Sequence, residues 1–411
     1  VDKSCMKKKF ILLTLLIAVA VAVFIGVSLT VSADEDKKIE LNENIIKLLE
    51  DLDLSELQKY LDENEDSYLF QYGDTAGEII KYLIQGNLNT DYGGYLNELL
   101  SILFKNVISL IPAFATVVAV ALLSAIVSSA EGNILGKSTS KIVHLACYSL
   151  IILIITSMLL GVISDCLSSI NSVRKQIEII TPILTTLTVL TGGTSSAAIY
   201  QPSAIFLSSG AVEIVGGFIF PATIAVIVLN FMSKLNTQMS FSGVTALMKS
   251  IMKWVIGITV TVFSIFITFQ SSASSLFDGI IFKATKYVVS NSVPIVGNFL
   301  SSGFDMLTSA GLLIKSSVGI CGLLLLLFEI LSPVILLSAF SLILKFVGAI
   351  VQPIGEKTLF SLLSDLSKDI EYFIAGLLTV AFMYALIIML VIKAGLLTVA
   401  FMYALIIMLV I

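Results

Sequence analysis

Long uninterrupted apolar runs constrain this chain more than any other feature of its sequence. Val107–Ser129, Ile142–Ile163 and Phe373–Ile392 each reach the roughly 20 residues that a helix needs to cross a bilayer. A membrane β-barrel would show shorter segments of alternating polarity instead. The sequence therefore predicts an all-α, polytopic helical membrane protein.

The composition agrees with this fold class. Of 411 residues, 57% are hydrophobic and 13% are charged, against about 25% charged in ordinary globular proteins. The mean hydropathy is +1.02. A chain this apolar has more apolar surface than soluble cores of this size can bury. Disordered chains are apolar-poor, so disorder is excluded as well. No basic run is large enough to indicate nucleic acid as a partner, whereas membrane lipid is expected.

The net charge of −5 is unevenly distributed. Residues 34–74 carry 14 acidic and 4 basic side chains, a net of −10, whereas residues 75–411 carry a net of only +2. The acidity therefore belongs to one short segment, and the remainder of the chain is nearly neutral.

The start of the chain has the layout of a secretory signal peptide, assigned to residues 1–33. Met6 to Lys9 supply a basic patch, Phe10–Thr30 is apolar, and the small residues Val31 and Ala33 suit cleavage before Asp34. Met6 is then the natural start of translation. An uncleaved anchor helix is the alternative, and both versions place the acidic segment outside the cytoplasm.

Residues 34–104 are predicted to form a small acidic helical region outside the membrane. Thr75 and Glu78 have the spacing of a capping box, which predicts a helix that begins there and ends near Gly86. A region of this size buries too little apolar surface to be robust alone. We expect it to pack on the membrane domain or on a partner protein.

Residues 105–392 are predicted to form a multi-pass membrane domain with about six spans plus re-entrant segments. Besides the three runs above, the spans are Ala204–Met232, Trp254–Phe269 and Ser317–Leu344. Ile177–Leu190 and Val288–Ile314 are weaker. We expect Ile177–Leu190 to be re-entrant or interfacial, because a full crossing would invert every later loop.

With six spans and the amino terminus outside, the basic residues show a small excess on the cytoplasmic side, as the positive-inside rule requires. Eight lysines then lie inside and five basic residues lie outside. The inside set is Lys137, Lys141, Lys234, Lys249, Lys253, Lys345, Lys357 and Lys368; the outside set is Arg174, Lys175, Lys283, Lys286 and Lys315.

Two carboxylates interrupt apolar segments and are candidate functional residues. Glu213 precedes Pro221, and Glu329 precedes Pro333. A carboxylate inside a span is costly and usually faces a bundle interior or a wet cavity. Broken helices with such residues occur at the transport sites of carriers, and Ser317–Leu344 is expected to be tilted, kinked, or folded as a re-entrant pair broken near Pro333. The alternative is that each Glu serves packing alone.

A short internal sequence similarity adds two further candidate functional residues. Glu178 and Pro182 stand in the segment EIITPI, which resembles EILSPV at Glu329 and Pro333. Corresponding proline-interrupted segments in two halves of a chain are typical of transporters, although six matched positions in apolar sequence are a weak signal.

Enzyme chemistry finds little support in the sequence. His144 is the only histidine, and no HExxH, GxSxG or Walker A spacing occurs. The four cysteines have neither metal-ligand nor paired spacing. We expect no catalytic residues, no cofactor and no metal.

The end of the chain contains an exact duplication. Residues 375–392 recur as residues 394–411, with Lys393 between the copies. Structural repeats diverge in sequence, so 393–411 is interpreted as a recent duplication or an assembly error and is given no function.

Several passages resemble the stage III sporulation protein AE family of endospore-forming bacteria. They are TAGEIIKYLIQGNL (75–88), QIEIITPILTTLTVLTGGTSSAAIYQP (176–202), FPATIAVIVLNFMSKLN (220–236) and GEKTLFSLLSDLSKDIEYF (355–373). The resemblance covers roughly residues 6–392 and rests on overall likeness rather than one diagnostic motif. Residues 1–5 and the duplicated tail depart from the family pattern.

The resemblance implies a permease-like, non-catalytic subunit of a secretion-like channel between mother cell and forespore, required for sporulation. It implies a site in the mother-cell membrane around the forespore. The implied partners are other membrane proteins of the stage III sporulation A operon and a forespore protein. From the residues alone, a self-sufficient secondary transporter using Glu329 and Glu213 is the alternative.

Overall fold

The computed structural model describes residues 43–63, 73–85, 110–124, 137–235, 241–292, 297–354 and 357–392, with a few single positions around 110–124. The predicted signal peptide at 1–33 and the duplicated tail at 393–411 lie outside the described residues. Every regular element in the described part is helical, which confirms the predicted all-α fold class.

Three short helices form a small unit before the bundle: α2 (Glu43–Glu50), α3 (Ser55–Asp62) and α4 (Ala76–Ile84). Leu57, Leu61 and Ile79 are fully buried between them and the bundle. The predicted capping box is confirmed, since the Glu78 amide donates to Thr75 Oγ1 at 3.2 Å and the Glu78 carboxylate accepts from the Thr75 amide. The helix ends at Ile84, so the sequence located it within two residues.

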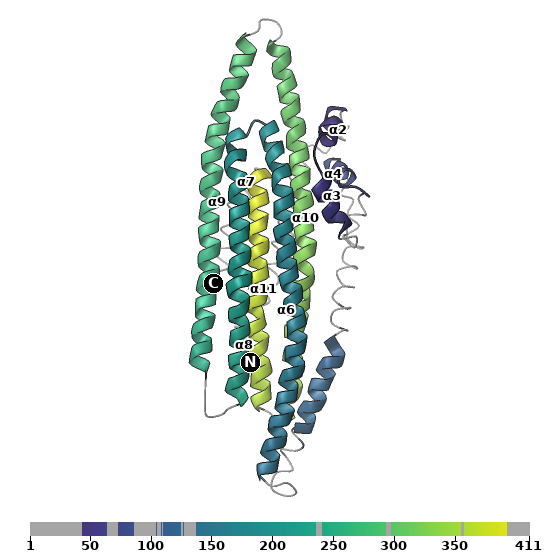
Figure 1. Cartoon of the computed structure of the whole chain (residues 1–411), viewed down its shortest axis with the longest axis vertical. Helices are drawn as coiled ribbons and strands as arrows, with labels where there is room; N and C mark the ends of the chain where they lie inside the picture. The colour runs from purple at the N-terminus through teal and green to yellow at the C-terminus, as the bar shows by residue number, and fades with distance from the viewer. Residues whose placement is uncertain are drawn as a thin grey trace.

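The membrane domain is a bundle of long helices that run alternately up and down (Figure 1). They are α6 (Lys137–Leu190), α7 (Thr194–Glu213) continued by a π-helical segment η2 (Ile214–Ile219) and α8 (Phe220–Leu235), α9 (Ser242–Ser292), α10 (Gly297–Val351), and α11 (Lys357–Ile392). A one-turn 3₁₀ segment η3 (Gln352–Ile354) follows α10.

Five of the described helices are long and apolar enough to cross a membrane, and Leu110–Ser124 is a shorter apolar helix within the first predicted span. The chain is therefore a multi-pass membrane protein. We call the end where α6 turns into α7 the upper end, and the end where α11 begins the lower end (Figure 1). The small unit of α2, α3 and α4 packs against α10 and α6 toward the upper end.

The central helix of the bundle is α11. Of its most apolar stretch 67% is buried, against 33% for α9. It contacts α10, α8, α6, α9 and α7, and Phe373, Leu377 and Leu386 are fully buried on it. The outward faces of α9 and α6 carry the exposed apolar residues that a lipid-facing helix requires.

Two predicted interruptions are absent, because the helices continue through their prolines. Residues 177–190 are the upper part of α6 and not a separate re-entrant segment, and α10 is one helix through Pro333 and not a broken pair. Hydroxyl groups bond main-chain carbonyls near both prolines: Thr186 bonds Pro182 O at 3.0 Å, and Ser338 bonds Val334 O at 2.7 Å. These bonds do not satisfy the carbonyls of Glu178 and Glu329, which are the ones that the two prolines leave without an amide donor.

The helices α6, α10 and α11 come close together at Gly322. A Cβ atom at this position would stand 2.8 Å from Ile180 Cδ1, 2.8 Å from Ile388 Cδ1 and 3.3 Å from Tyr384 Oη. Glycine is therefore needed here for space, as in other close membrane helix contacts.

Gly322→Ala is expected to destabilise the bundle by about 1–3 kcal/mol, because the added methyl group forces the buried Ile180 and Ile388 side chains out of their packed positions. The measurement is the thermal unfolding midpoint of the detergent-solubilised protein. Gly161→Ala on α6 is the matched control, since nothing lies within 4 Å of its Cβ position. Equal midpoints for the two variants would contradict the packing described here.

Candidate functional site: a polar upper end on an apolar bundle

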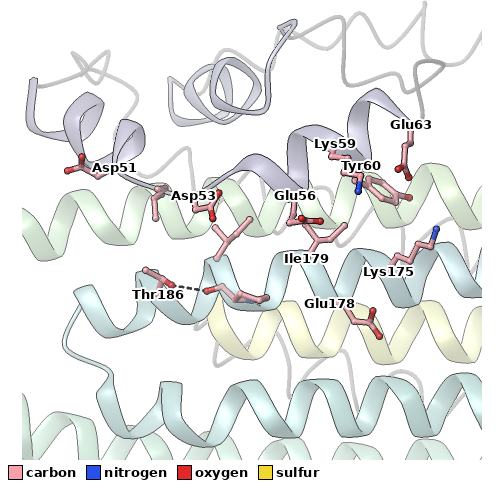
Figure 2. Close-up of a pocket in the computed structure, with 13 residues that line it drawn as sticks. Asp51, Asp53, Glu56, Lys59, Tyr60, Glu63, Lys175, Glu178, Ile179 and Thr186 are labelled. Carbon is pink, nitrogen blue, oxygen red and sulfur yellow. Dashed lines mark hydrogen bonds between the residues drawn. The ribbon is translucent and has the colours of Figure 1, made fainter.

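An acidic groove lies between α3 and the upper part of α6 (Figure 2). Its volume is about 670 Å³, and five carboxylates but only two lysines line it. Leu52, Ile179 and Ile183 supply apolar lining between the charges. The charged lining residues are Asp51, Asp53, Glu56, Lys59, Glu63, Lys175 and Glu178.

Local hydrogen bonds shape the rim of this groove. Asp53 Oδ1 accepts from the Ser55 amide at 3.1 Å and from the Ser55 hydroxyl at the start of α3. These bonds lower the pKa of the Asp53 carboxyl. Glu178 on the opposite wall pairs with Arg174 one helical turn earlier, with 3.1 Å between the charged atoms. The groove is therefore negatively charged at neutral pH.

Tyr60 anchors α3 to the bundle beside the groove. Gln176 on α6 is buried, and its Nε2 donates to Tyr60 Oη at 2.9 Å and approaches Leu325 O on α10 at 3.5 Å. Burial raises the pKa of Tyr60 to about 12, so its hydroxyl stays protonated at neutral pH. The buried side-chain amide of Gln176 on α6 thus contacts both α3 and α10.

The candidate residue Glu329 lies next to this joint. It is half-buried on α10, and its carboxylate lies near the side chains of Ser169 and Ser172 of α6. Pro333 is buried one turn further along α10. The structure thus places Glu329 in a polar contact between two helices.

The two similar segments, 178–183 and 329–334, lie on neighbouring helices but at different levels, because Glu329 lies near Ser169 and Ser172. Gln176 and Ile180 of α6 face Leu325 and Gly322 of α10, respectively. Glu178 and Pro182, in the first of the two similar segments, are exposed and line the groove, unlike Glu329 and Pro333. The two carboxylates therefore have different surroundings despite their similar sequence.

The candidate residue Glu213 is exposed at the end of α7. The π-helical segment η2 follows it immediately, and π-bulges are frequent at functional sites. A Cβ at Gly217 would lie 2.8 Å from Glu213 Oε1, so glycine leaves room for this carboxylate. Pro221 opens the next helix and is also exposed.

A second polar cluster, which the sequence reasoning missed, lies toward the lower end. Asp369 of α11 is completely buried. Its carboxylate lies 2.5 Å from Lys249 Nζ of α9 and accepts from Asn230 Nδ2 of α8 at 2.6 Å. Lys234 of α8 reaches Asp365 at 3.6 Å beside it. The cluster fixes three helices to one another.

One signal for this cluster was present in the sequence. Asp369 stands on the same helical stripe as Leu362, Leu366 and Phe373, which are all buried. A charge on an apolar stripe predicts a buried partner, but its partners Asn230 and Lys249 are distant in the chain.

Removing one partner of the ion pair between Asp369 and Lys249 is expected to lower the stability of the protein strongly. Asp369→Asn leaves Lys249 uncompensated and should cost about 3–5 kcal/mol, measured as the loss of thermal stability in detergent. The double variant Asp369→Asn with Lys249→Met should lose less than the sum of the single losses. Additive losses would contradict a coupled buried pair.

The described residues contain no group of three or more His, Cys, Asp or Glu side chains that could hold a metal ion. The groove's negative charge and apolar lining are complementary to basic groups that carry apolar side chains.

Comparison with known proteins gives a consistent result. The family model described as "Stage III sporulation protein AE" matches residues 75–395. The curated protein "Stage III sporulation protein AE" of Bacillus subtilis (strain 168) is 24% identical over 318 residues, covering 77% of this chain and 79% of that protein. No solved structure matches.

Proposed function

Because this chain belongs to the stage III sporulation protein AE family, we propose that it is a non-catalytic, permease-like membrane subunit of a secretion-like channel required for sporulation. Its place is the mother-cell membrane around the forespore, with the upper end of the bundle outside the cytoplasm. The partners are other membrane proteins of the stage III sporulation A operon and a forespore protein.

The acidic groove is the observation that carries this proposal. A self-contained transporter has no need of an acidic helical unit held at one end of its bundle. Here α3 is anchored through Tyr60 and Gln176, and the groove beside it has a fixed, negatively charged rim with apolar lining. Fixed charge of one sign favours partners of the opposite charge and disfavours others.

Charge reversal in the groove tests the docking role. Glu56→Lys with Glu63→Lys should abolish co-purification of partner subunits and lower the yield of heat-resistant spores at least tenfold, because like charges then face a basic partner segment. Partner recovery and spore counts are the measurements.

The matched control for this test changes the net charge equally outside the groove. Glu50→Lys with Asp74→Lys alters two exposed carboxylates of the same small unit that do not line the groove. This control should assemble and sporulate as the unchanged protein does. Equal defects in the two double variants would contradict a specific docking role.

A secondary transporter that uses Glu329 is the second candidate, favoured by its half-buried place beside Ser169 and Ser172. Under the subunit proposal, Glu329→Gln keeps the shape and polarity of the side chain and leaves spore yield within about twofold of the unchanged protein. Under the transporter proposal, the same variant loses proton-driven uptake by purified protein in vesicles. The two readouts separate the two functions.

A further inference from the structure

The outward stripe of α6 changes character along its length. In its lower part it carries exposed leucines, with Leu153 at 66% and Leu160 at 58% exposure. From Ser164 upward the stripe is polar at every helical turn. Its exposed polar residues there, which we call the polar stripe, are Ser164, Asp165, Ser168, Asn171, Arg174 and Lys175. Leu167, at 36% exposure, is the one exposed apolar residue among them.

The outward stripe of α9 does not change in this way. Its exposed residues from Trp254 to Phe269 are apolar except for Thr261 and Thr268, whose hydroxyls bond main-chain carbonyls of the preceding turn. Val262 is 60% and Phe269 76% exposed. Lipid is the natural neighbour of such a face, and Trp254 suits an interfacial level near its lower end.

Contacts across η2 and α8 show that these two regions lie at the same level of the bundle. Gly216 of η2 lies beside Leu167 of α6, and Thr223 of α8 bonds Met252 Sδ of α9 at 3.4 Å. Seven residues separate Gly216 from Thr223, about 10 Å along the axis. The level of Leu167 on α6 is therefore that of roughly residue 259 on α9, and the polar stripe faces outward at the level of Ile258–Phe269.

A flat bilayer that covers the apolar face of α9 therefore also reaches the polar stripe. If lipid covered α6 there, the side chains of Asp165, Arg174 and Lys175 would sit in or near hydrocarbon, where each charge costs several kcal/mol. Charged residues at membrane depth face a water-filled cavity or other protein instead.

We propose that the polar stripe of α6 forms one wall of a water-filled passage, closed on its other sides by further chains of the assembly. This deepens the proposed channel function and rests on it. The upper part of the stripe runs directly into the acidic groove, since Lys175 and Glu178 line that groove. The groove then stands at the mouth of the passage, where a hydrophilic solute or chain segment enters.

Cysteine accessibility in the assembled complex tests this proposal. In a full-length chain whose native cysteines are replaced, Ser168→Cys and Asn171→Cys report on the polar stripe. Val262→Cys and Ile265→Cys on α9 are the matched controls at the same level. The probe is a membrane-impermeant, positively charged methanethiosulfonate reagent added to membranes from sporulating cells, with the extent of modification followed over time.

The stripe positions should react at least tenfold faster than the α9 positions. Equally slow reaction at all four positions would show that lipid or tightly packed protein covers the stripe. Equally fast reaction at all four would show that this level lies outside the bilayer. Either result overturns the proposal.

This readout is independent of the groove test. Labelling measures water at α6 in the assembled membranes, whereas groove charge reversal measures partner docking and spore yield. Fast stripe labelling with normal sporulation of the groove variant would refute the docking role alone. Slow stripe labelling with a failed groove variant would refute the passage alone.

Discussion

Backbone hydrogen bonding inside an apolar medium is the constraint on which this structure depends. A chain in lipid finds no water to satisfy its amides and carbonyls, so a spanning segment that is not part of a closed barrel must be helical. This explains why α6 and α10 continue through Pro182 and Pro333, where a soluble protein would more readily break. With the backbone satisfied internally, the helices associate through close packing, as at Gly322, and through a small number of buried polar side chains.

Those polar side chains give the bundle two unlike ends. Toward the lower end, Asp369 joins α11 to α9 and α8 through Lys249 and Asn230, so charge is used there to lock helices together. At the upper end, Gln176 holds the acidic helix α3 through Tyr60. The charges that line the groove are accessible there, whereas Lys315 of α10 is buried. The lower cluster therefore stabilises the fold, whereas the upper end presents charge to other molecules.

Much of this fold follows from the sequence, because the length of an apolar run and the residues of a helix cap can be read from a short stretch of chain. The apolar runs located the membrane helices, and Thr75 with Glu78 located the start of α4. Ile177–Leu190 is not a separate re-entrant segment and α10 is not a broken pair, because the rest of each continuous helix outweighs one missing amide. Glu329 was identified as a polar interruption, but its partners Ser169 and Ser172 and the cluster around Asp369 join residues far apart in the chain, and one sequence carries no information on such pairings.

The side of the membrane on which the acidic groove opens decides whether the upper end can meet a partner outside the cytoplasm. Single cysteines at Lys59 of α3 and Thr358 at the start of α11, both exposed positions, report on the two ends in an otherwise cysteine-free chain. When the chain is produced in growing, non-sporulating cells, its extracytoplasmic side faces the medium. In such intact cells, an impermeant maleimide should label position 59 at once and position 358 only after the membrane is permeabilised. Labelling of position 358, but not position 59, in intact cells would contradict the orientation and with it the docking and passage roles of the upper end.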